Sequence, residues 1–460
     1  MSDLNGAAGR RIVSLLDANS FVEIGGSITA RSTDFNMDEK KAPSDGVITG
    51  YGTVDGSLVY VYSQDSSVLN GTVGEMHAKK IVSLYKLAMK TGAPVIGMID
   101  CGGVRLQEST DALNAIGSLY MSEVMASGVI PQITAVFGNC GGGLSVVPAL
   151  SDFTYVEGSK GRLFVNTPNA VKDNTKDACD TSAADYQAAK GNVDFVGSDA
   201  EIYANIRSLV SMLPGNNEDE GEIVDTNDDP NRSVEGIDRI AAADQLALIA
   251  DNGVFTETKK AYASEIVTGF MRMNGVTVGA VANNGKELMA KAVEKAADFI
   301  KFCDAYGIPV VTFVNVEKMA QTKCAEARMP KAAASLAYAY ADATVPKVTV
   351  VTGKAYGTPY VLMGSKSVGA DMVYAWPNAE IGMMDAKSAA KILYADADAE
   401  TLKKGAEEFS SLQQSVSSAA ARGYVDTIID PQDTRKYVIG ALEMLYTKRE
   451  DRPVKKHGTV

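Results

Sequence analysis

The sequence predicts an α/β fold built from two copies of one structural unit. Two observations support this prediction: part of the first half recurs in the second half at a constant spacing, and each copy alternates apolar strands with amphipathic helices. The chain of 460 residues is long enough for two to three domains, each with a sizeable core.

The internal repeat has an offset of 215 residues and runs without a gap from the first matched helix to a glycine-containing turn. Its matched pairs include Lys80 with Lys295, Gly92 with Gly307, Pro94 with Pro309, Pro131 with Pro346, Gly138 with Gly353 and Gly142 with Gly357. Because chance matches among glycines would not keep one spacing over so many positions, the two halves are expected to share a fold.

Each copy is expected to contain a helix closed by glycine, a buried strand, a second helix, and a second buried strand that ends in a turn of small residues. The buried strands are predicted at residues 94–100, 133–137, 309–315 and 348–352. A strand hairpin is predicted ahead of each copy, within residues 46–62 and 266–282.

A polar, acidic stretch containing proline connects the halves at residues 213–230. It predicts a domain boundary near residue 225, with domains at 1–225 and 226–460. Since nothing in the sequence fixes its carboxylates, we interpret the stretch as a solvated linker and predict no metal site.

Composition narrows the function classes. The net charge of −13 argues against a nucleic-acid partner, which needs an excess of basic residues on one face. No apolar run is long enough for a membrane span, so no direct membrane insertion is expected. The amino terminus lacks the pattern of a secretory signal, which predicts a cytoplasmic protein. The five cysteines contain no CxxC pair and are expected to be reduced thiols.

Histidine is scarce, with only His77 and His457 in the chain. His457 lies in a basic carboxy-terminal tail, so a serine or cysteine nucleophile activated by histidine would depend on His77 alone. His77 stands at the start of a predicted helix, which favours a packing or capping role over proton transfer.

The most informative element is the glycine-rich loop at residues 138–143, between an apolar strand and an apolar helical stretch. Backbone amides at such a turn can hold an oxyanion or a phosphate, although glycines there also serve tight packing. Residues 100–105 end the preceding strand and contain Gly102 and Gly103, where a second pair of free amides is expected to converge on the first. Two backbone donors would stabilise a thioester enolate without a side-chain base.

Motifs spread over most of the chain match one protein family. They lie at residues 45–56, 63–65, 74–79, 87–92, 100–108, 299–304, 339–347, 354–357 and 375–381. On these motifs the chain resembles the carboxyltransferase subunits of biotin-dependent propionyl-CoA and acetyl-CoA carboxylases, of methylmalonyl-CoA and glutaconyl-CoA decarboxylases, and of transcarboxylase.

The resemblance implies two tandem crotonase-like domains, with acyl-CoA bound mostly by the first and carboxybiotin entering from the second. It implies carboxyl transfer between carboxybiotin and an acyl-CoA, such as propionyl-CoA and methylmalonyl-CoA or acetyl-CoA and malonyl-CoA. The implied partners are a biotin carboxyl carrier protein and a biotin carboxylase or a membrane decarboxylase subunit. The implied active site needs halves from two chains, so a homo-oligomer is expected, with a dimer as the minimum and a hexamer as the family habit.

The resemblance also assigns residues. The catalytic oxyanion holes fall to the amides of Gly142 and Gly143 in the first half and of Gly357 and Thr358 in the second. The residues assigned to substrate contact are Gly102, Gly103, Val104, Gly141, Leu144 and Val361. The sequence at 88–90 looks like a biotinylation motif, but it ends a helix, lacks the methionine expected after the lysine and recurs in the family, so biotin is expected on a separate carrier.

The second half departs from the family pattern. Glu317 and Lys318 stand where the repeat has Gly102 and Gly103, and their side chains are expected to hinder close approach. Pro359 has no N–H and is expected to remove an oxyanion donor.

Three readings therefore stay open: an active biotin-dependent carboxyltransferase, a CoA-binding paralogue that acts as a structural partner in a mixed complex, and a biotin-independent enzyme. The last reading would draw its acid or base from Glu108, Asp111 or His77. Substrate choice and reaction direction are not set by the sequence.

Overall fold

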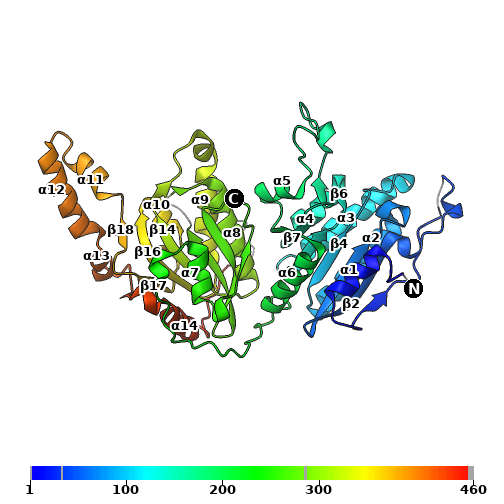
Figure 1. The fold of residues 1–460 in the computed structure, drawn as a ribbon, viewed down its shortest axis with the longest axis horizontal. Coiled ribbons are helices and arrows are strands. Elements are labelled where there is room, and N and C mark those ends of the chain that lie inside the picture. The colour runs from blue at the N-terminus through cyan, green and yellow to red at the C-terminus, as the bar shows by residue number, and fades with distance from the viewer. Residues whose placement is uncertain (1–2, 33–34, 284–286, 454–460) are drawn as a thin grey trace. The chain divides into compact units, whose positions relative to one another are not determined.

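The computed structural model describes residues 3–32, 35–283 and 287–453, and it divides the chain into two compact units, Met1–Gly221 and Glu222–Val460 (Figure 1). The boundary expected near residue 225 lies a few residues further along the chain. Val224 explains the difference, because its N–H already donates to the carbonyl oxygen of Gly275 in the second unit, at 3.1 Å.

The described part of the first unit contains a seven-stranded sheet. In spatial order its strands are β1 (Val22–Ile24), β2 (Val47–Val54), β3 (Ser57–Gln64), β4 (Val95–Ile99), β5 (Gln132–Val136), β7 (Phe153–Glu157) and β9 (Phe195–Gly197). The first three strands pair antiparallel, and from β3 onward the pairing is parallel. The helices are α1 (Ala7–Leu15), α2 (Glu75–Thr91), α3 (Ser109–Ala126), α4 (Val146–Leu150), α5 (Ala184–Ala189) and α6 (Asp199–Met212).

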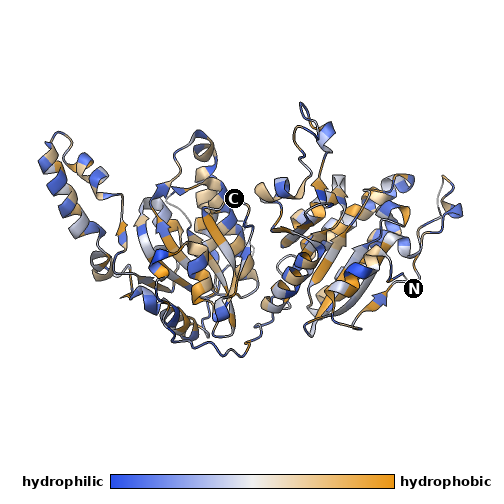
Figure 2. Cartoon of the chain, viewed as in Figure 1, coloured by the Kyte–Doolittle hydropathy of each residue, from blue (hydrophilic) through white to orange (hydrophobic). Residues whose placement is uncertain are grey.

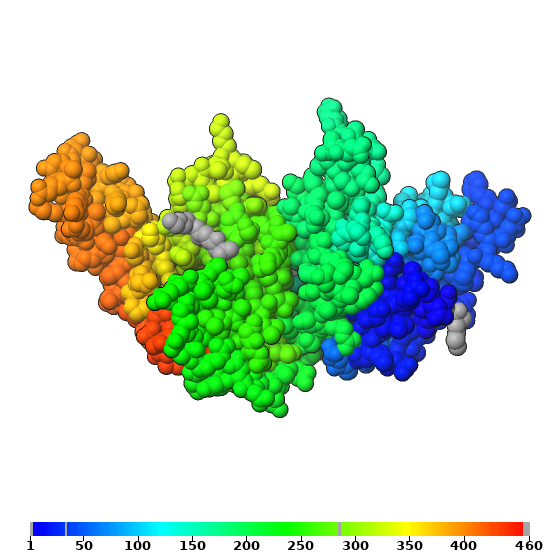
Figure 3. All heavy atoms as spheres, in the orientation of Figure 1, coloured from blue at the N-terminus to red at the C-terminus, as the bar shows by residue number. Residues whose placement is uncertain are grey.

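The second unit repeats this plan in the described residues. Its sheet runs β10 (Phe255–Thr258), β11 (Ile266–Met273), β12 (Val276–Asn283), β14 (Val310–Val316), β16 (Lys347–Tyr356), β17 (Met372–Ala375) and β19 (Thr427–Ile428), with β18 (Glu380–Gly382) beside β16. The helices are α7 (Ala242–Ile249), α8 (Ala290–Ala305), α9 (Lys323–Asp342), α10 (Gly357–Leu362), α11 (Ala386–Leu393), α12 (Ala399–Phe409), α13 (Val416–Ala421) and α14 (Thr434–Met444). The α11–α12 segment projects from the rest of this unit (Figure 3).

The repeat predicted from the sequence is confirmed at the level of backbone geometry. The strands β4 and β14 begin at Val95 and Val310, which keep the spacing of the sequence repeat. The left-handed φ angles recur as well, at 60° for Gly142 and 59° for Gly357. Both are positions where an L side chain is strained, so glycine is selected by the same turn in each unit.

The cores lie along the central parallel strands. Every residue of β4 and of β5 is buried, as expected for parallel strands covered by helices on both faces. Figure 2 shows apolar residues along these strands in each unit. Because parallel strands end at one edge of a sheet, the loops that follow β4 and β5 are brought to the same place.

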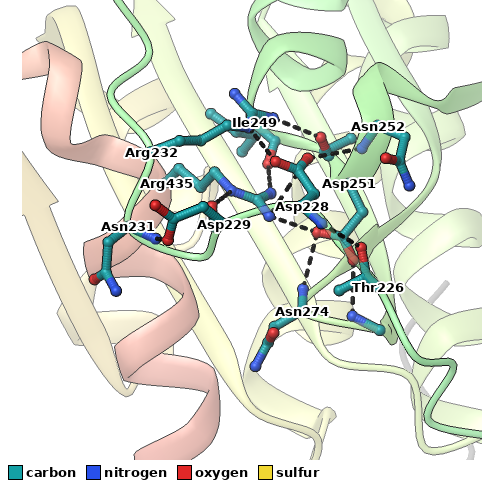
Figure 4. Close-up of polar contacts among 12 residues, drawn as sticks. Thr226, Asp228, Asp229, Asn231, Arg232, Ile249, Asp251, Asn252, Asn274 and Arg435 are labelled. Carbon is teal, nitrogen blue, oxygen red and sulfur yellow. Dashed lines mark hydrogen bonds and ion pairs between the residues drawn. The ribbon is translucent and has the colours of Figure 1, made fainter.

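An arginine at the end of each unit fastens the hairpin to a helix. In the second unit Arg435 of α14 donates to the carbonyl of Ile249, which ends α7, and to Asp251 Oδ1 at 2.7 Å (Figure 4). Asp251 in turn accepts the N–H groups of Asn274 at 3.0 Å and Gly275 at 2.7 Å in the turn between β11 and β12. One buried ion pair thus ties the last helix, α7 and the hairpin together.

The first unit has the same arrangement, formed by other residues. Arg207 of α6 donates to the carbonyl of Leu15, which ends α1, and to Asp17 Oδ1, both at 2.8 Å. Asp17 accepts the N–H groups of Asp55 at 3.0 Å and Gly56 at 2.9 Å in the turn between β2 and β3. Hydrogen bonds from Gly56, Arg207 and Thr53 hold the pKa of Asp17 well below its usual value.

Candidate functional site

The glycine-rich loop of the first unit follows β5. Its residues 139–141 form the short strand β6 (Asn139–Gly141), which pairs with β8 (Arg162–Phe164), and a 3-10 helix then runs from Gly142 to Ser145. A Cβ atom on Gly141 would lie 2.5 Å from the Phe164 ring, whereas one on Gly142 would meet nothing within 4 Å. Gly141 therefore serves packing, and Gly142 faces open space.

Gly143 carries the amide best placed to bind an oxyanion. It is exposed, and its N–H stands in the first turn of the 3-10 helix, where the helix itself provides no acceptor. Leu144 lies in the core with 2% of its surface exposed, so its side chain is not open to a ligand. The accessible face of the loop is Gly142 and Gly143, whose catalytic role stays a prediction.

The expectation of a second pair of free amides at Gly102 and Gly103 is wrong. The Gly102 N–H donates to the carbonyl of Asn70 at 2.8 Å, and the Gly103 N–H donates to Cys101 Sγ at 3.2 Å. The loop closes on itself and on the segment before α2, because Val104 also forms a parallel bridge with Val73. Gly103 still faces open space, so this loop can form a wall of the site, while the amides of Gly102 and Gly103 already have acceptors.

A buried charge cluster holds that wall. Arg105 directly follows Val104, and its guanidinium lies 2.6 Å from Asp45 and 2.9 Å from Glu108, with all three side chains at 0–1% exposure. Arg105 also donates to the carbonyl of Thr72 at 2.7 Å. Burial raises the pKa of Asp45, and the neighbouring Arg105 opposes that rise.

His77 is part of the same cluster and is fully buried. Its Nδ1 lies 2.9 Å from the carbonyl oxygen of Asp45, which can only accept, so Nδ1 carries the proton. Its Nε2 then accepts from the amide of Gln64 at 3.1 Å. Burial, with a smaller contribution from Arg105, lowers the pKa of His77 to about 3. The ring is a neutral structural link, in agreement with the packing role expected for it, and His457 lies outside the described residues.

The other acids proposed for biotin-independent chemistry are engaged too. Glu108 accepts from Arg105 and from the N–H of Glu75, which begins α2. Asp111 is exposed and pairs with Arg31 at 2.9 Å. Both carboxylates are held by these partners in this arrangement, which disfavours the biotin-independent reading.

The second unit contains a cavity of about 840 Å³ at its own glycine turn. Its lining includes Glu317, Lys318, Lys354, Tyr356, Gly357, Thr358, Pro359, Glu380, Met383, Asp385, Lys387 and Gln414. Val361 is not among the lining residues, so its expected substrate contact stays a prediction.

The repeat offers a second interpretation of Pro359, and its role as a lost oxyanion donor stays a prediction. Gly142 and Gly143 correspond to Gly357 and Thr358, the first two residues of α10, and Pro359 corresponds to Leu144. In a 3-10 helix that begins at Gly142, the Leu144 N–H points back at the Gly141 carbonyl. Pro359 therefore corresponds to a residue whose amide bonds within the turn of the first unit, and the amides of Gly357 and Thr358 precede it in α10.

Glu317 and Lys318 form an extended segment in place of the glycine turn. Lys318 and Met319 make the short strand β15, which pairs with β13 (Glu287–Leu288), just as Val104 pairs with Val73. The charged side chains of Glu317 and Lys318 both form ion pairs: Glu317 with Lys354 at 2.9 Å, and Lys318 with Glu287 at 2.8 Å. These pairs hold both side chains at the rim of the cavity.

The cavity contains a further interacting pair, Tyr356 and Glu380, to which the sequence analysis assigned no contact with each other. The hydroxyl of Tyr356 donates to Glu380, across the pairing of β16 with β18. Burial raises the pKa of Tyr356, and the hydrogen bond to Glu380 adds to the rise. Both residues stand inside family motifs, but only the strand pairing shows that they meet.

Comparison with known proteins decides the family. The family model described as "Carboxyl transferase domain" matches residues 6–460. The chain belongs to this family. The carboxyltransferase is 41% identical to the methylmalonyl-CoA decarboxylase subunit alpha of Veillonella parvula and 39% identical to the propionyl-CoA carboxylase beta chain of Roseobacter denitrificans. These alignments cover 98% of this chain and 92% and 93% of the relatives.

Among solved structures, the carboxyltransferase is similar to transcarboxylase 12S, determined as a hexamer with methylmalonyl-coenzyme A and methylmalonic acid bound. The TM-score is 0.95 at 39% identity, covering 99% of this chain and 93% of that one. The methylmalonyl-CoA carboxyltransferase 12S subunit of Propionibacterium freudenreichii subsp. shermanii is 40% identical over 98% of the chain and 90% of its own length.

These findings confirm the fold class, two tandem crotonase-like domains, and the enzyme class expected from the sequence. Carboxyltransferases of this family use coenzyme A thioesters and carboxybiotin from a separate carrier, so the cofactor expectation is confirmed as well. The relatives are named as subunits or chains of enzymes of methylmalonyl-CoA or propionyl-CoA. Within the described residues, no helix is long and apolar enough to cross a membrane.

Proposed function

We propose that this carboxyltransferase moves a carboxyl group between carboxybiotin on a separate carrier protein and the pair methylmalonyl-CoA and propionyl-CoA. The observation that carries the proposal is the match to transcarboxylase 12S with methylmalonyl-coenzyme A bound, at a TM-score of 0.95 over 99% of the chain. The names of the relatives in Veillonella parvula and Roseobacter denitrificans refer to the same two acyl groups.

The first unit supports the thioester enolate. When the α-carbon loses a proton or a carboxyl group, negative charge moves onto the thioester oxygen, and the N–H of the exposed Gly143 is a backbone donor for it. The open space in front of Gly142 lets the thioester approach the backbone. No side-chain base is required of this unit, since His77 is buried and neutral and Glu108 is paired with Arg105.

The second unit fits the carrier-bound cofactor. Its cavity of about 840 Å³ is large enough for a small ring system, and the leading amides of α10, at Gly357 and Thr358, lie in the cavity wall. Carboxybiotin bound there supplies the carboxyl group. The ion pairs of Glu317 and Lys318 narrow the rim without filling the cavity.

The proposed partners are a biotin carrier protein, a biotin carboxylase or membrane decarboxylase subunit, and further copies of this chain. Apolar side chains on α3 support a homo-oligomer of at least two chains. Leu113 is 62% exposed and Met121 is 59% exposed on this helix. On α11, Ile392 and Leu393 are also more than half exposed.

The test is carboxyl exchange by the purified chain with a biotinylated carrier protein and methylmalonyl-CoA labelled in its free carboxyl group. Label should move to the carrier or leave as carbon dioxide, and avidin should abolish the reaction. Acyl-CoA binding without any exchange would instead identify the structural-partner reading. Decarboxylation that avidin does not affect would overturn the biotin-dependent mechanism.

Gly142→Ala tests the site itself. The change should lower exchange by about 100-fold, because a methyl group enters the space in front of the oxyanion donors and the left-handed φ of 60° is strained. Gly307→Ala is the matched control: its φ is 66°, a Cβ there also meets nothing within 4 Å, and it closes α8 away from the glycine turn. Equal losses in the two variants would show that backbone strain alone explains the effect.

A further inference from the structure

We infer that Ser145 and Tyr120 are positioning residues that fix the two peptide groups flanking Gly143 and so set the direction of the oxyanion-binding N–H. This inference rests on the proposed function and names side chains that the glycine loop needs for it. Both hydroxyls donate to carbonyl groups of the loop: Ser145 Oγ to Gly142 at 2.7 Å, and the Tyr120 hydroxyl to Gly143.

Ser145 acts on the peptide that carries the donor. The Gly142 carbonyl and the Gly143 N–H belong to one planar peptide group and point in opposite directions. A hydrogen bond to the carbonyl therefore fixes the direction of the N–H, and it polarises the group so that the N–H is a stronger donor. Ser145 is 9% exposed, and this small exposure limits competition from water for its hydroxyl.

Tyr120 acts on the next peptide. It reaches the loop from α3, and its hydroxyl accounts for the one heavy atom that a Cβ on Gly143 would approach, at 3.2 Å. With the Gly143 carbonyl held there, the peptides on both sides of Gly143 are fixed by side chains. The run of three glycines at 141–143 would otherwise be among the most flexible stretches of backbone, and an oxyanion hole has to be rigid before the charge develops.

Comparison of the two glycine turns shows that this arrangement is not a general requirement of the fold. At the spacing of 215 residues, Tyr360 stands opposite Ser145, and Ser335 stands opposite Tyr120. The second unit keeps the left-handed glycine at Gly357, but the Ser335 hydroxyl meets Lys301 at 3.3 Å, and within the described residues neither the Ser335 nor the Tyr360 hydroxyl bonds the carbonyl of Gly357 or Thr358. Because the turn forms there without these hydrogen bonds, the bonds made by Ser145 and Tyr120 serve the thioester side in particular.

The experiment compares Ser145→Ala, Ser145→Thr and Tyr120→Phe with two matched controls. Ser151→Ala removes a hydroxyl that bonds the Val147 carbonyl and Thr134 at the other end of α4. Tyr203→Phe removes a hydroxyl from α6, where the ring packs on Phe137. Exchange kinetics with methylmalonyl-CoA are measured for all five, and deuterium uptake is measured for the peptide that covers residues 139–145.

Ser145→Ala and Tyr120→Phe should each lower kcat by about tenfold to 100-fold with KM within about twofold, because the interaction they support strengthens only as charge develops. Ser145→Thr should recover most of kcat, and the controls should match the wild type. The 139–145 peptide should take up deuterium faster in Ser145→Ala and Tyr120→Phe only.

Unchanged kcat in both variants, or a rise in KM at constant kcat, would overturn the inference while leaving the proposed function intact. Absence of exchange in the wild type would instead defeat the proposed function, and deuterium uptake would still show whether the hydroxyls hold the loop. If Ser145→Ala does not fold, Tyr120→Phe decides the kinetic question, because its partly exposed side chain loses one hydroxyl and no packing.

Discussion

The two units share their scaffold and differ at the glycine turn. Lys80 and Lys295 occupy matching positions on α2 and α8, and both ammonium groups are buried against backbone carbonyls: Ser44 and Val47 in the first unit, Lys259 and Ile266 in the second. The arginine that joins the last helix to the hairpin is also repeated. Contacts that hold the fold have therefore been kept in both copies.

The turns to which the proposed function assigns the chemistry have diverged. In the first unit Gly142 faces open space and Gly143 is exposed, and Ser145 and Tyr120 hold their carbonyl groups. In the second unit the matching residues are Gly357 and Thr358, followed by a proline. One unit fixes a flexible turn with side chains, and the other reduces its flexibility with a proline ring, whose φ is preset for the first turn of a helix. This difference matches two ligands of different chemistry on one scaffold.

The largest expected effect comes from breaking the shared arginine contact in the two units in turn. Arg435 is fully buried, so Arg435→Ala should lower the free energy of unfolding by about 3–5 kcal/mol, because Asp251 loses its buried partner. Arg207 and Asp17 keep 27% and 28% of their side-chain surface, so Arg207→Ala should cost about 1 kcal/mol.

The single tryptophan makes this comparison measurable. Trp376 is buried in the second unit, and its indole N–H donates to Thr434, the residue before Arg435, at 3.0 Å. Tryptophan fluorescence during urea unfolding therefore reports on the second unit, and hydrogen exchange of β2 and β3 peptides reports on the first. Similar losses in the two variants would show that burial does not distinguish the two contacts.

The sequence predicted the repeat, the central strands and the glycine turns because these features are local and periodic. It did not predict the arginine contacts, whose partners lie 190 and 184 residues apart in the chain. It also assigned free amides to Gly102 and Gly103, because sequence shows where glycine stands but not that the Asn70 carbonyl comes within 2.8 Å. Ser145 stands in an apolar stretch of the sequence. Its hydrogen bond to the Gly142 carbonyl depends on the 3-10 turn that the glycines form, so the sequence alone did not predict it.

A smaller effect on the free energy of unfolding is expected from His77. This residue has no counterpart in the repeat, because the second unit has Ala292 at the matching position. The pKa of His77 falls to about 3 in the folded chain, from 6.5. Between these values the unfolded chain binds a proton that the native chain does not, so this contribution to stability is present above pH 6.5 and is lost as the pH falls towards 3.

His77→Gln removes that pH dependence. The stability difference between the wild type and the variant, followed by hydrogen exchange in the first unit, should shrink as the pH falls from 7 to 4. Fluorescence of Trp376 provides the internal control, since the second unit should show no difference between the two proteins. A difference that stays constant over this range would mean that His77 keeps its proton affinity on folding.

The smallest effect is expected at Pro359, where the divergence of the turns is tested directly. If proline had removed an oxyanion donor, Pro359→Gly would raise exchange by a hundredfold or more. The correspondence with Leu144 predicts a change within about threefold, together with a loss of up to about 1 kcal/mol, because glycine gives the unfolded chain more freedom. Exchange kinetics and urea unfolding of the variant measure both. Leu362→Ala, at the buried end of α10, controls for a general loosening of that helix, since it destabilises by removing apolar contacts and leaves the amides of Gly357 and Thr358 in place.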